Sequence, residues 1–142
     1  MTFKQVGAKD AHSLIENDGY VYVDIRSLPE FDAGHPKGAF NVPLMHMGAG
    51  GMEPNNDFLS VMQKAFTADQ KIIIGCKAGG RSLKAAQLLS AAGFTNIVDQ
   101  KGGFSGQTDP FGRVVERGWS TESLPCSTAP EAGHDYATLS RR

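Results

Sequence analysis

Residues 71–93 constrain the fold of this 142-residue chain more than any other segment. Residues 71–75 read Lys-Ile-Ile-Ile-Gly, and a short apolar run rich in β-branched residues predicts a buried strand. Glycines at positions 79 and 80 predict a turn, and apolar residues spaced by three and four then predict a helix that ends at a glycine. Cys76 is therefore expected at the mouth of a strand–loop–helix turn.

A thiol at this position is expected to be reactive. Backbone N–H groups of the turn and the N-terminus of the following helix can converge on the sulfur of Cys76 and favour the thiolate, which is the reactive form. Lys77 and Arg81 add two cations, and Gly79 and Gly80 let the backbone curl with its amides inward. A buried, inert thiol is the plainer interpretation of a single cysteine, but these four neighbours favour a reactive one.

Three blocks of the sequence occur in an order that matches one known family. The loop reads Cys76, Lys77, Ala78, Gly79, Gly80, Arg81 and Ser82. The other blocks are Val23-Asp24-Ile25-Arg26 with Glu30-Phe31, Gly34-His35 and the run from Gly38 to Pro43, and later Gly102-Gly103, Trp119 and Leu124-Pro125. The loop resembles the Cys-x-x-Gly-x-Arg-Ser active-site loop of rhodanese-domain sulfurtransferases. The other blocks are similar to that family's "VDVR…EF…GHIPGAINIP" and "GG…W…GLP" runs.

The resemblance implies an α/β protein with the rhodanese-like fold, a central five-stranded parallel sheet flanked by helices on both faces. It also implies a sulfurtransferase in which Cys76 attacks the outer sulfur of a donor such as thiosulfate. Sulfite leaves, and the persulfide passes its sulfur to cyanide or a thiol. The backbone amides of residues 77–82 would stabilise the anionic sulfur, while Lys77 and Arg81 would attract the sulfonate. No cofactor is implied.

Two other functions are compared with this one. Phosphatases and arsenate reductases of related folds have loops that resemble Cys-x5-Arg, whereas four residues separate Cys76 from Arg81. The shorter loop favours a ring of amides fitted to one sulfur atom. A persulfide carrier, sensor or adaptor with little turnover stays open as an alternative, as does a protein acceptor of the sulfur.

Three polar residues upstream of the loop are candidates for supporting roles. Asp24 and Arg26 lie at the C-terminal end of a strand predicted over residues 20–25. In open parallel sheets, ligands bind at the edge formed by the carboxyl ends of the strands. A structural pair that orients the following loop is preferred to a catalytic pair. His35 is expected to be a hydrogen-bonded structural histidine, because no second His, Cys or carboxylate stands at ligand spacing, and no metal site is predicted.

Several further elements are expected from local patterns. Strands are predicted at residues 3–6 and 96–98, helices at 8–16 and 58–66, and a helical turn at 113–116. The Met- and Gly-rich segment 44–52 is predicted to be a loop near the active-site face, either a lip that binds the acceptor or a surface insertion.

Residues 1–126 are expected to form a single domain, followed by a tail. Residues 127–142 are rich in Pro, Ser, Thr, Ala and Gly, which predicts loose packing. Cys126 at the start of this tail is expected to be dispensable, although a resolving thiol is the alternative.

Composition and charge limit the kinds of binding partner and the cellular compartment that are expected. A net charge of −1 gives no support for binding to nucleic acid or to an anionic membrane. No run approaches the ~20 apolar residues of a membrane span, and the N-terminal residues lack the apolar segment of a secretory signal. A reducing, cytoplasmic setting is expected, with the protein a monomer or a homodimer.

Overall fold

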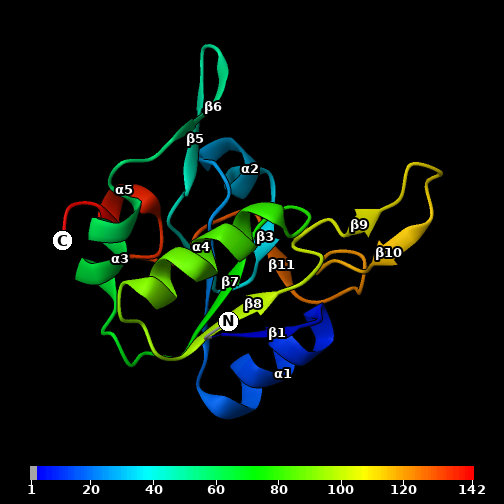
Figure 1. Cartoon of the computed structure of the whole chain (residues 1–142), viewed down its shortest axis with the longest axis horizontal. Coiled ribbons are helices and arrows are strands. Elements are labelled where there is room, and N and C mark those ends of the chain that lie inside the picture. Colours follow the sequence, from blue (N-terminus) through cyan, green and yellow to red (C-terminus); the bar gives the residue numbers. More distant parts are fainter. Residues whose placement is uncertain (1–2) are drawn as a thin grey trace.

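A computed structural model describes residues 3–142, which form a five-stranded parallel sheet with helices on both faces (Figure 1). The strands are β1 (Lys4–Val6), β2 (Val21–Asp24), β4 (Phe40–Asn41), β7 (Ile72–Gly75) and β8 (Ile97–Gln100). Their spatial order is β1-β8-β7-β2-β4, and every neighbouring pair is parallel. The predicted α/β class and the five-stranded parallel sheet are confirmed.

Within residues 3–142, five helices surround this sheet. They are α1 (Ala8–Asp18), α2 (Leu28–Ala33), α3 (Phe58–Ala65), α4 (Gly80–Ala91) and α5 (Tyr136–Leu139). Apolar residues of α3, α4 and α5 join one buried cluster against the sheet, while α1 and α2 contribute to the cluster on the opposite face. The helices predicted at 8–16 and 58–66 are present as α1 and α3, with small shifts at their ends.

The central strand β7 is buried on both faces. Ile72 and Ile74 pack into the cluster with α3, α4 and α5, whereas Ile73 packs with Trp119 on the face of α1. Side chains of a strand alternate between its two faces, so a strand covered on both sides needs an uninterrupted apolar run. This explains the three consecutive isoleucines at positions 72–74.

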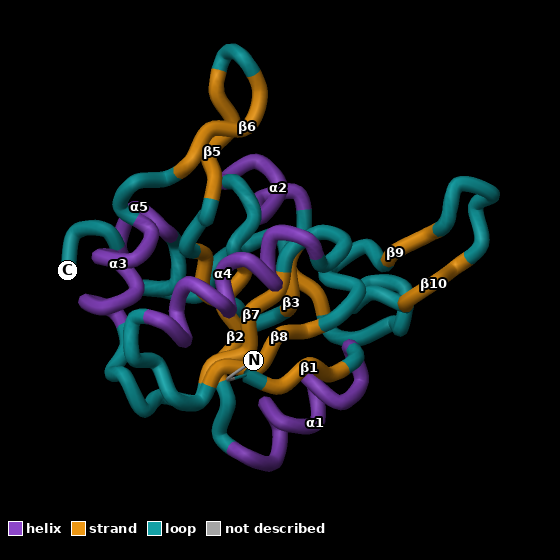
Figure 2. Tube along the Cα trace, viewed as in Figure 1, coloured by secondary structure: helices purple, strands orange, loops and turns teal. Residues whose placement is uncertain are grey.

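Two antiparallel hairpins project from the body as arms (Figure 2). The first joins β5 (Met45–Gly48) to β6 (Gly51–Pro54), with Met47 opposite Met52. The prediction of a loop over residues 44–52 is wrong, because alternating side chains and a two-residue connection close a regular hairpin there. The second joins β9 (Gln107–Thr108) to β10 (Val114–Glu116), so the helical turn predicted at 113–116 is also wrong. Its β-branched valines, Val114 and Val115, suit a strand.

The segment 127–142 is corrected from a loosely packed tail to part of the folded domain. Strand β11 (Cys126–Ser127) pairs with β3 (His35–Pro36), and α5 follows it. The side chain of Asp135 caps α5, while Tyr136 and Leu139 pack against the core. The prediction rested on the polar average composition of the segment. That average gives no sign of Tyr136 and Leu139, which lie at the i, i+3 spacing of a helix, or of the Asp135 cap before them.

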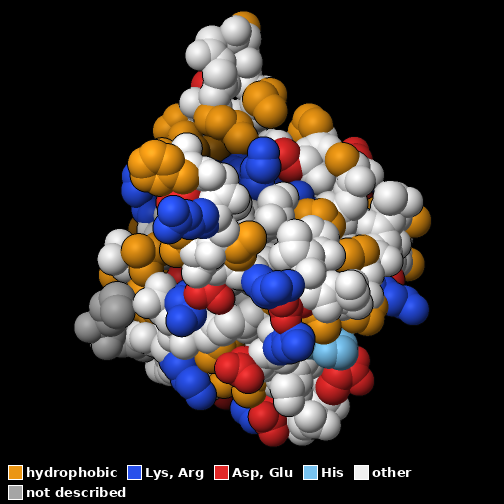
Figure 3. All heavy atoms as spheres, turned by 90° about the vertical axis from the view of Figure 1, so that its right-hand side faces the viewer, with side chains coloured by type: hydrophobic (Ala, Val, Ile, Leu, Met, Phe, Trp, Pro, Cys, Tyr) orange, Lys and Arg blue, Asp and Glu red, His pale blue; other side chains and the backbone are white. Residues whose placement is uncertain are grey.

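The surface carries charges of both signs and several exposed apolar side chains. Figure 3 shows Lys and Arg interspersed with Asp and Glu, and apolar side chains gathered at the base of the β5–β6 projection. Phe111, between β9 and β10, is 85% exposed. Within residues 3–142, no helix has the length and apolar character needed to cross a bilayer.

The packing of α5 predicts a measurable contribution to stability. Leu139 is fully buried, so Leu139→Ala should lower the free energy of unfolding by about 2–4 kcal/mol, from lost apolar burial and a residual cavity. Leu88→Ala is the matched control, since Leu88 is 41% exposed and its truncation should cost no more than about 0.5 kcal/mol. Denaturant titration measures both values. Equal values for the two variants would show that α5 does not pack on the core.

Candidate active site

Cys76 directly follows the central strand β7 and is only 2% exposed. Its sulfur accepts a hydrogen bond from the backbone N–H of Gly79, at 3.1 Å. Gly79 has a φ of +117°, a conformation that L side chains rarely adopt, and it precedes the first residue of α4. The loop therefore brings a backbone amide and a helix N-terminus to one sulfur atom, an arrangement that stabilises the thiolate.

A second glycine turn supports this loop from behind. The N–H of Phe104 donates to the carbonyl oxygen of Cys76 at 2.7 Å, and the N–H of Ser105 donates to that of Lys77 at 2.9 Å. A Cβ on Gly103 would collide with both carbonyl groups. The glycine at position 103 is therefore required by the close approach of two backbones, which sequence alone could not show.

Arg81 is paired with a carboxylate from another element. Its two terminal nitrogens donate to the two oxygens of Glu30 on α2, at 2.8 and 2.9 Å. The hydroxyl and the N–H of Ser27 also donate to Glu30 Oε1, which completes a capping box at the start of α2. Hydrogen bonding from Arg81 is the main cause that lowers the pKa of Glu30 to about 2, and it outweighs the opposite effect of burial. Arg81, which was expected to attract the sulfonate of a donor, forms a bidentate tie between α2 and α4 in this structure.

The other predicted loop residues divide by exposure. Lys77, Ala78 and Gly80 are exposed, and no ion pair joins Lys77 to any residue of the described part of the chain. Ser82 is fully buried, and its hydroxyl donates to the carbonyl oxygen of Gly79 at 3.1 Å. Lys77 is thus an exposed cation of the loop, while the Ser82 side chain is buried in the protein.

Asp24 and Arg26 form a buried ion pair at the end of β2. The guanidinium donates to both oxygens of Asp24, with Nη2 to Oδ2 at 2.7 Å, and Nη2 also donates to the carbonyl oxygen of Gly34 at 2.6 Å. The guanidinium carbon lies 4.5 Å from the centroid of the Phe104 ring. Burial raises the pKa of Asp24, and the hydrogen bonds from Arg26 oppose that rise. These contacts support the structural interpretation of the pair, which joins the β2 end to the following loop.

His35 is enclosed by its own segment. It is buried, its Nδ1 lies 2.8 Å from the carbonyl oxygen of Phe31, and its ring stacks on that of Phe31 at 3.7 Å between centroids. Across residues 3–142, no three His, Cys, Asp or Glu side chains are grouped so as to hold a metal ion. The contacts support a structural histidine.

Cys126 lies in β11, exposed and opposite Pro36, and it is a free thiol like Cys76. Its Sγ lies 3.3 Å from the carbonyl oxygen of Leu124, and partial burial raises its pKa. Helix α5 follows it in the chain, so Cys126 does not open a loosely packed tail.

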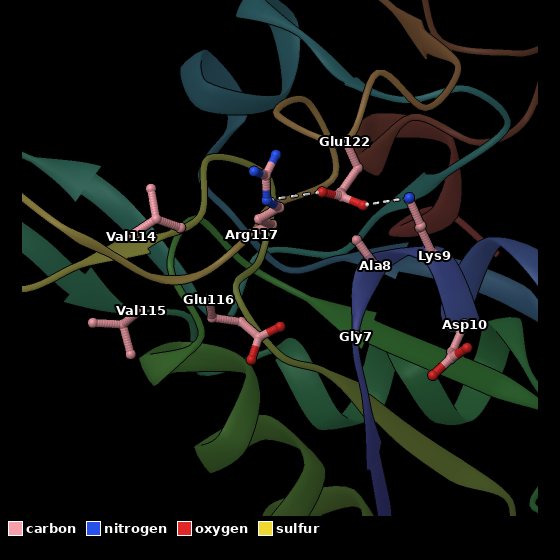
Figure 4. A pocket seen from close by; sticks show the side chains of 9 residues that line it. All are labelled: Gly7, Ala8, Lys9, Asp10, Val114, Val115, Glu116, Arg117 and Glu122. Carbon is pink, nitrogen blue, oxygen red and sulfur yellow. Dashed lines mark ion pairs between the residues drawn. The ribbon is translucent and has the colours of Figure 1, made fainter.

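Two hollows in the surface help to locate the chemistry. The hollow in Figure 4, of about 480 Å³, lies between the start of α1 and β10, where Glu122 pairs with Lys9 at 3.3 Å and with Arg117 at 3.4 Å. It is lined by no thiol and by none of residues 76–82. A second hollow, of about 320 Å³, lies against Gly79, Gly80 and Asp99. The second hollow adjoins the loop, but Cys76 does not line it either, so the candidate chemistry is assigned to the loop around Cys76 and not to either hollow.

Glu30 and Asp99 were not singled out as site residues from the sequence. The Ser27-x-x-Glu30 spacing is a capping-box signal that could have placed Glu30 in the first turn of a helix. No local pattern could have shown that this helix lies against Arg81, since the two residues are 51 positions apart.

The chain matches the family model for the rhodanese-like domain over residues 7–109. Thiosulfate sulfurtransferase 16, chloroplastic, from Arabidopsis thaliana is 47% identical over 95 residues, which cover 67% of this chain and 78% of that protein. Thiosulfate sulfurtransferase 18 from the same plant is 33% identical over 128 residues, covering 89% of this chain and 85% of the relative. The match to senescence-associated protein DIN1 of Raphanus sativus, at 44% identity, spans only 47% of that protein.

Solved structures share the fold. The crystal structure of Rv0390 from M. tuberculosis superposes with a TM-score of 0.72 at 25% sequence identity, covering 89% of this chain and 98% of that one. A rhodanese-related protein from Thermoplasma volcanium superposes with a TM-score of 0.63 at 24% identity, covering 89% of this chain and 100% of its own.

The Glu30–Arg81 pair predicts a specific dependence of stability on pH. Glu30 has a pKa of about 2 in the folded chain against an ordinary value of 4.5, so the unfolded chain takes up this proton first as pH falls. The stabilisation is present above about pH 4.5 and is lost as pH falls toward 2. Glu30→Gln should lower the free energy of unfolding by about 1 kcal/mol at neutral pH and reduce its slope in that window.

Denaturant titrations at a series of pH values measure this effect. Glu53→Gln is the control, because Glu53 is exposed on β6 and has no ion pair among the described residues. A slope for Glu30→Gln identical to that of the parent would contradict the pairing.

Proposed function

Because this chain belongs to the rhodanese-like domain family, we propose that it is a sulfurtransferase whose Cys76 takes a sulfane sulfur from thiosulfate or a similar donor. The sulfur then passes to cyanide or to a thiol. The hydrogen bond from the Gly79 N–H to the Cys76 sulfur is the observation that carries this function, because it stabilises negative charge on the nucleophile. The names of two thiosulfate sulfurtransferase relatives support the same reaction class.

The reaction is two successive displacements at sulfur. The Cys76 thiolate attacks the outer sulfur of thiosulfate, a new S–S bond forms, and the S–S bond of thiosulfate breaks as sulfite leaves with the electron pair. Cyanide then attacks the outer sulfur of the persulfide and leaves as thiocyanate, and the Cys76 thiolate returns. A thiolate acceptor would leave as a persulfide in the same way, and neither path needs an outside oxidant or reductant.

The loop residues contribute in different ways. The Gly79 amide would stabilise the anionic sulfur, and the exposed Lys77 would draw in the anionic donor. Arg81 is neutralised by Glu30 and acts by holding the start of α4 against α2. The cationic attraction is thereby assigned to Lys77 rather than shared with Arg81.

A protein that carries the acceptor thiol is the second candidate partner. Met47 on β5 is 56% exposed and Met52 on β6 is 37% exposed, and methionine-rich surfaces adapt to protein partners. With such a partner, the chain could act as a persulfide carrier instead of an enzyme that turns over small thiols. An assay with small thiols separates these two functions: efficient turnover supports the enzyme, whereas loading of Cys76 without release of the sulfur supports the carrier.

The central prediction is a covalent intermediate on Cys76. Thiosulfate should add about 32 Da to the intact protein, cyanide should remove it, and Cys76→Ser should abolish both the adduct and the turnover. Cys126→Ser is the matched control and should retain turnover within about twofold, because Cys126 lies outside the loop. Intact-protein mass spectrometry and a thiocyanate assay read both outcomes. A Cys76→Ser variant with near-parental turnover would falsify the mechanism.

Lys77 should act on donor binding more than on the chemical steps. Lys77→Ala should raise KM for thiosulfate about fivefold and leave kcat within about twofold. The reason is that the variant loses an electrostatic attraction of about 1 kcal/mol between the exposed Lys77 ammonium and the anionic donor. Lys84→Ala on the exposed face of α4 is the control and should leave KM unchanged. The Lys77 effect should shrink as salt is added. An unchanged KM for Lys77→Ala at low salt would contradict this role.

A further inference from the structure

Gln100 is a fully buried amide at the end of β8, next to the turn that supports the loop. Its Nε2 donates to the carbonyl oxygen of Lys101 at 2.7 Å and to that of Gly103 at 3.0 Å. Its Oε1 accepts a hydrogen bond from the Tyr22 hydroxyl at 2.5 Å. Carbonyl oxygens only accept, so the amide nitrogen must face the turn and the amide oxygen must face Tyr22. One buried side chain thus joins β2, β8 and the turn.

Tyr22 reaches Gln100 across the strand that leads to Cys76. β7 lies between β2 and β8 in the sheet, and Gly75 is its last residue. A Cβ at position 75 would collide with the Tyr22 hydroxyl, so the missing side chain leaves the space in which this hydroxyl lies. Burial raises the pKa of Tyr22, which keeps the hydroxyl protonated and able to donate. The bond from Tyr22 to Gln100 is therefore made against the residue that precedes Cys76.

The peptide unit between Gly103 and Phe104 connects Gln100 to the nucleophile. Its carbonyl oxygen accepts from Gln100 Nε2 at 3.0 Å, and its N–H donates to the carbonyl oxygen of Cys76 at 2.7 Å. A peptide unit is planar, so the direction of its carbonyl group sets the direction of its N–H. One rigid group therefore separates the Gln100 side chain from the backbone of Cys76.

The turn has a second anchor in the backbone. The N–H of Trp119 also donates to the carbonyl oxygen of Gly103, at 2.9 Å. Within residues 3–142, Gln100 is the only side chain that donates to the carbonyl of Gly103 or to that of Lys101. Loss of the Gln100 amide should therefore loosen the turn without unfolding it, which makes a graded effect on Cys76 measurable.

We propose that Gln100 is a positioning residue for Cys76 and that Tyr22 holds Gln100 in place. The amide orients the 103–104 peptide unit, which fixes the Cys76 carbonyl and keeps the sulfur against the Gly79 N–H. Neither side chain touches the reacting atoms. The inference deepens the sulfur transfer proposed above, and its catalytic meaning rests on that function. A merely structural amide would add stability and leave the reactivity of the thiol unchanged.

Alkylation of Cys76 by iodoacetamide tests this role without turnover. The pH at which the rate reaches half its plateau reports how well the thiolate is stabilised, whereas exposure of the sulfur changes only the plateau. Gln100→Met keeps the size of the side chain and removes its three hydrogen bonds. It should raise this midpoint by about half a pH unit, because the Gly79 N–H becomes misaligned with the sulfur. Tyr22→Phe removes one of the three bonds and should give a smaller rise. Peptide mass separates Cys76 from Cys126.

A second buried amide, Asn55, provides the matched control. Its Nδ2 donates to the carbonyl oxygen of Pro43 at 2.9 Å and to the Tyr136 hydroxyl at 3.1 Å. In the described part of the chain, neither Asn55 nor Tyr136 forms a hydrogen bond with residues 76–82 or 101–105. Asn55→Leu and Tyr136→Phe should lower stability in denaturant titrations as the Gln100 and Tyr22 variants do, but should keep the parental midpoint.

Turnover of thiosulfate and cyanide gives the second readout. Gln100→Met should lower kcat about fivefold and leave KM within about twofold, because the sulfur is misplaced while Lys77 still attracts the donor. The double variant Tyr22→Phe/Gln100→Met should match Gln100→Met, since Tyr22 acts through Gln100. If the midpoints shift in the expected order while the parent does not turn over thiosulfate, the positioning role stands and the donor assignment fails.

Three results would overturn the proposal. The first is a parental midpoint for Gln100→Met, and the second is an equal rise for Asn55→Leu, which would show a general effect of lost stability. The third is a parental midpoint for Tyr22→Phe, the milder change, which decides the question if Gln100→Met does not fold.

Discussion

The burial of β7 on both faces and its pairing on both edges determine where the rest of the site lies. β2 and β8 run parallel to β7, so their carboxyl ends reach the same edge of the sheet. That edge receives Cys76 from β7, Asp24 from β2 and Asp99 from β8. Cys76 therefore directly follows the central strand of the sheet, and the glycines after it supply the conformational freedom that its loop needs.

The loop gains its shape from contacts made by distant parts of the chain. The turn at residues 102–105 donates two backbone hydrogen bonds to it from behind, and Glu30 ties Arg81 from the side. Gly75 extends the same principle into the strand, because a Cβ there would collide with the Tyr22 hydroxyl. Close contacts, made by the Tyr22 side chain at Gly75 and by the loop backbone at Gly103, account for these two glycines.

Local periodicity and the motif at residues 76–82 were enough to predict three features: the α/β fold class, the parallel sheet and the strand–loop–helix around Cys76. The arms and the tail could not. At 44–52, three glycines suggested a flexible loop, although strand pairing with Met47 opposite Met52 closes a hairpin over residues 45–54. In the tail, the polar average concealed Leu139, whose burial depends on where α3 and α4 lie. The pairing of Arg81 with Glu30 could not be predicted either, because it is a tertiary contact. The sequence contains several carboxylates and gives no ground for choosing Glu30 among them.

Under the proposed function, the distribution of charge around the sulfur would suit a small anionic donor that is attracted rather than clamped. Two arginines lie near the loop, yet Asp24 neutralises Arg26 and Glu30 neutralises Arg81. A bidentate clamp for an oxyanion needs a free guanidinium fork, and both forks are occupied by carboxylates. The exposed Lys77 is a point charge on a flexible stem, which attracts an anion without fixing its geometry. In the proposed reaction, orientation of the transferred sulfur would therefore fall to the backbone amide of Gly79, which donates to the Cys76 sulfur in this structure.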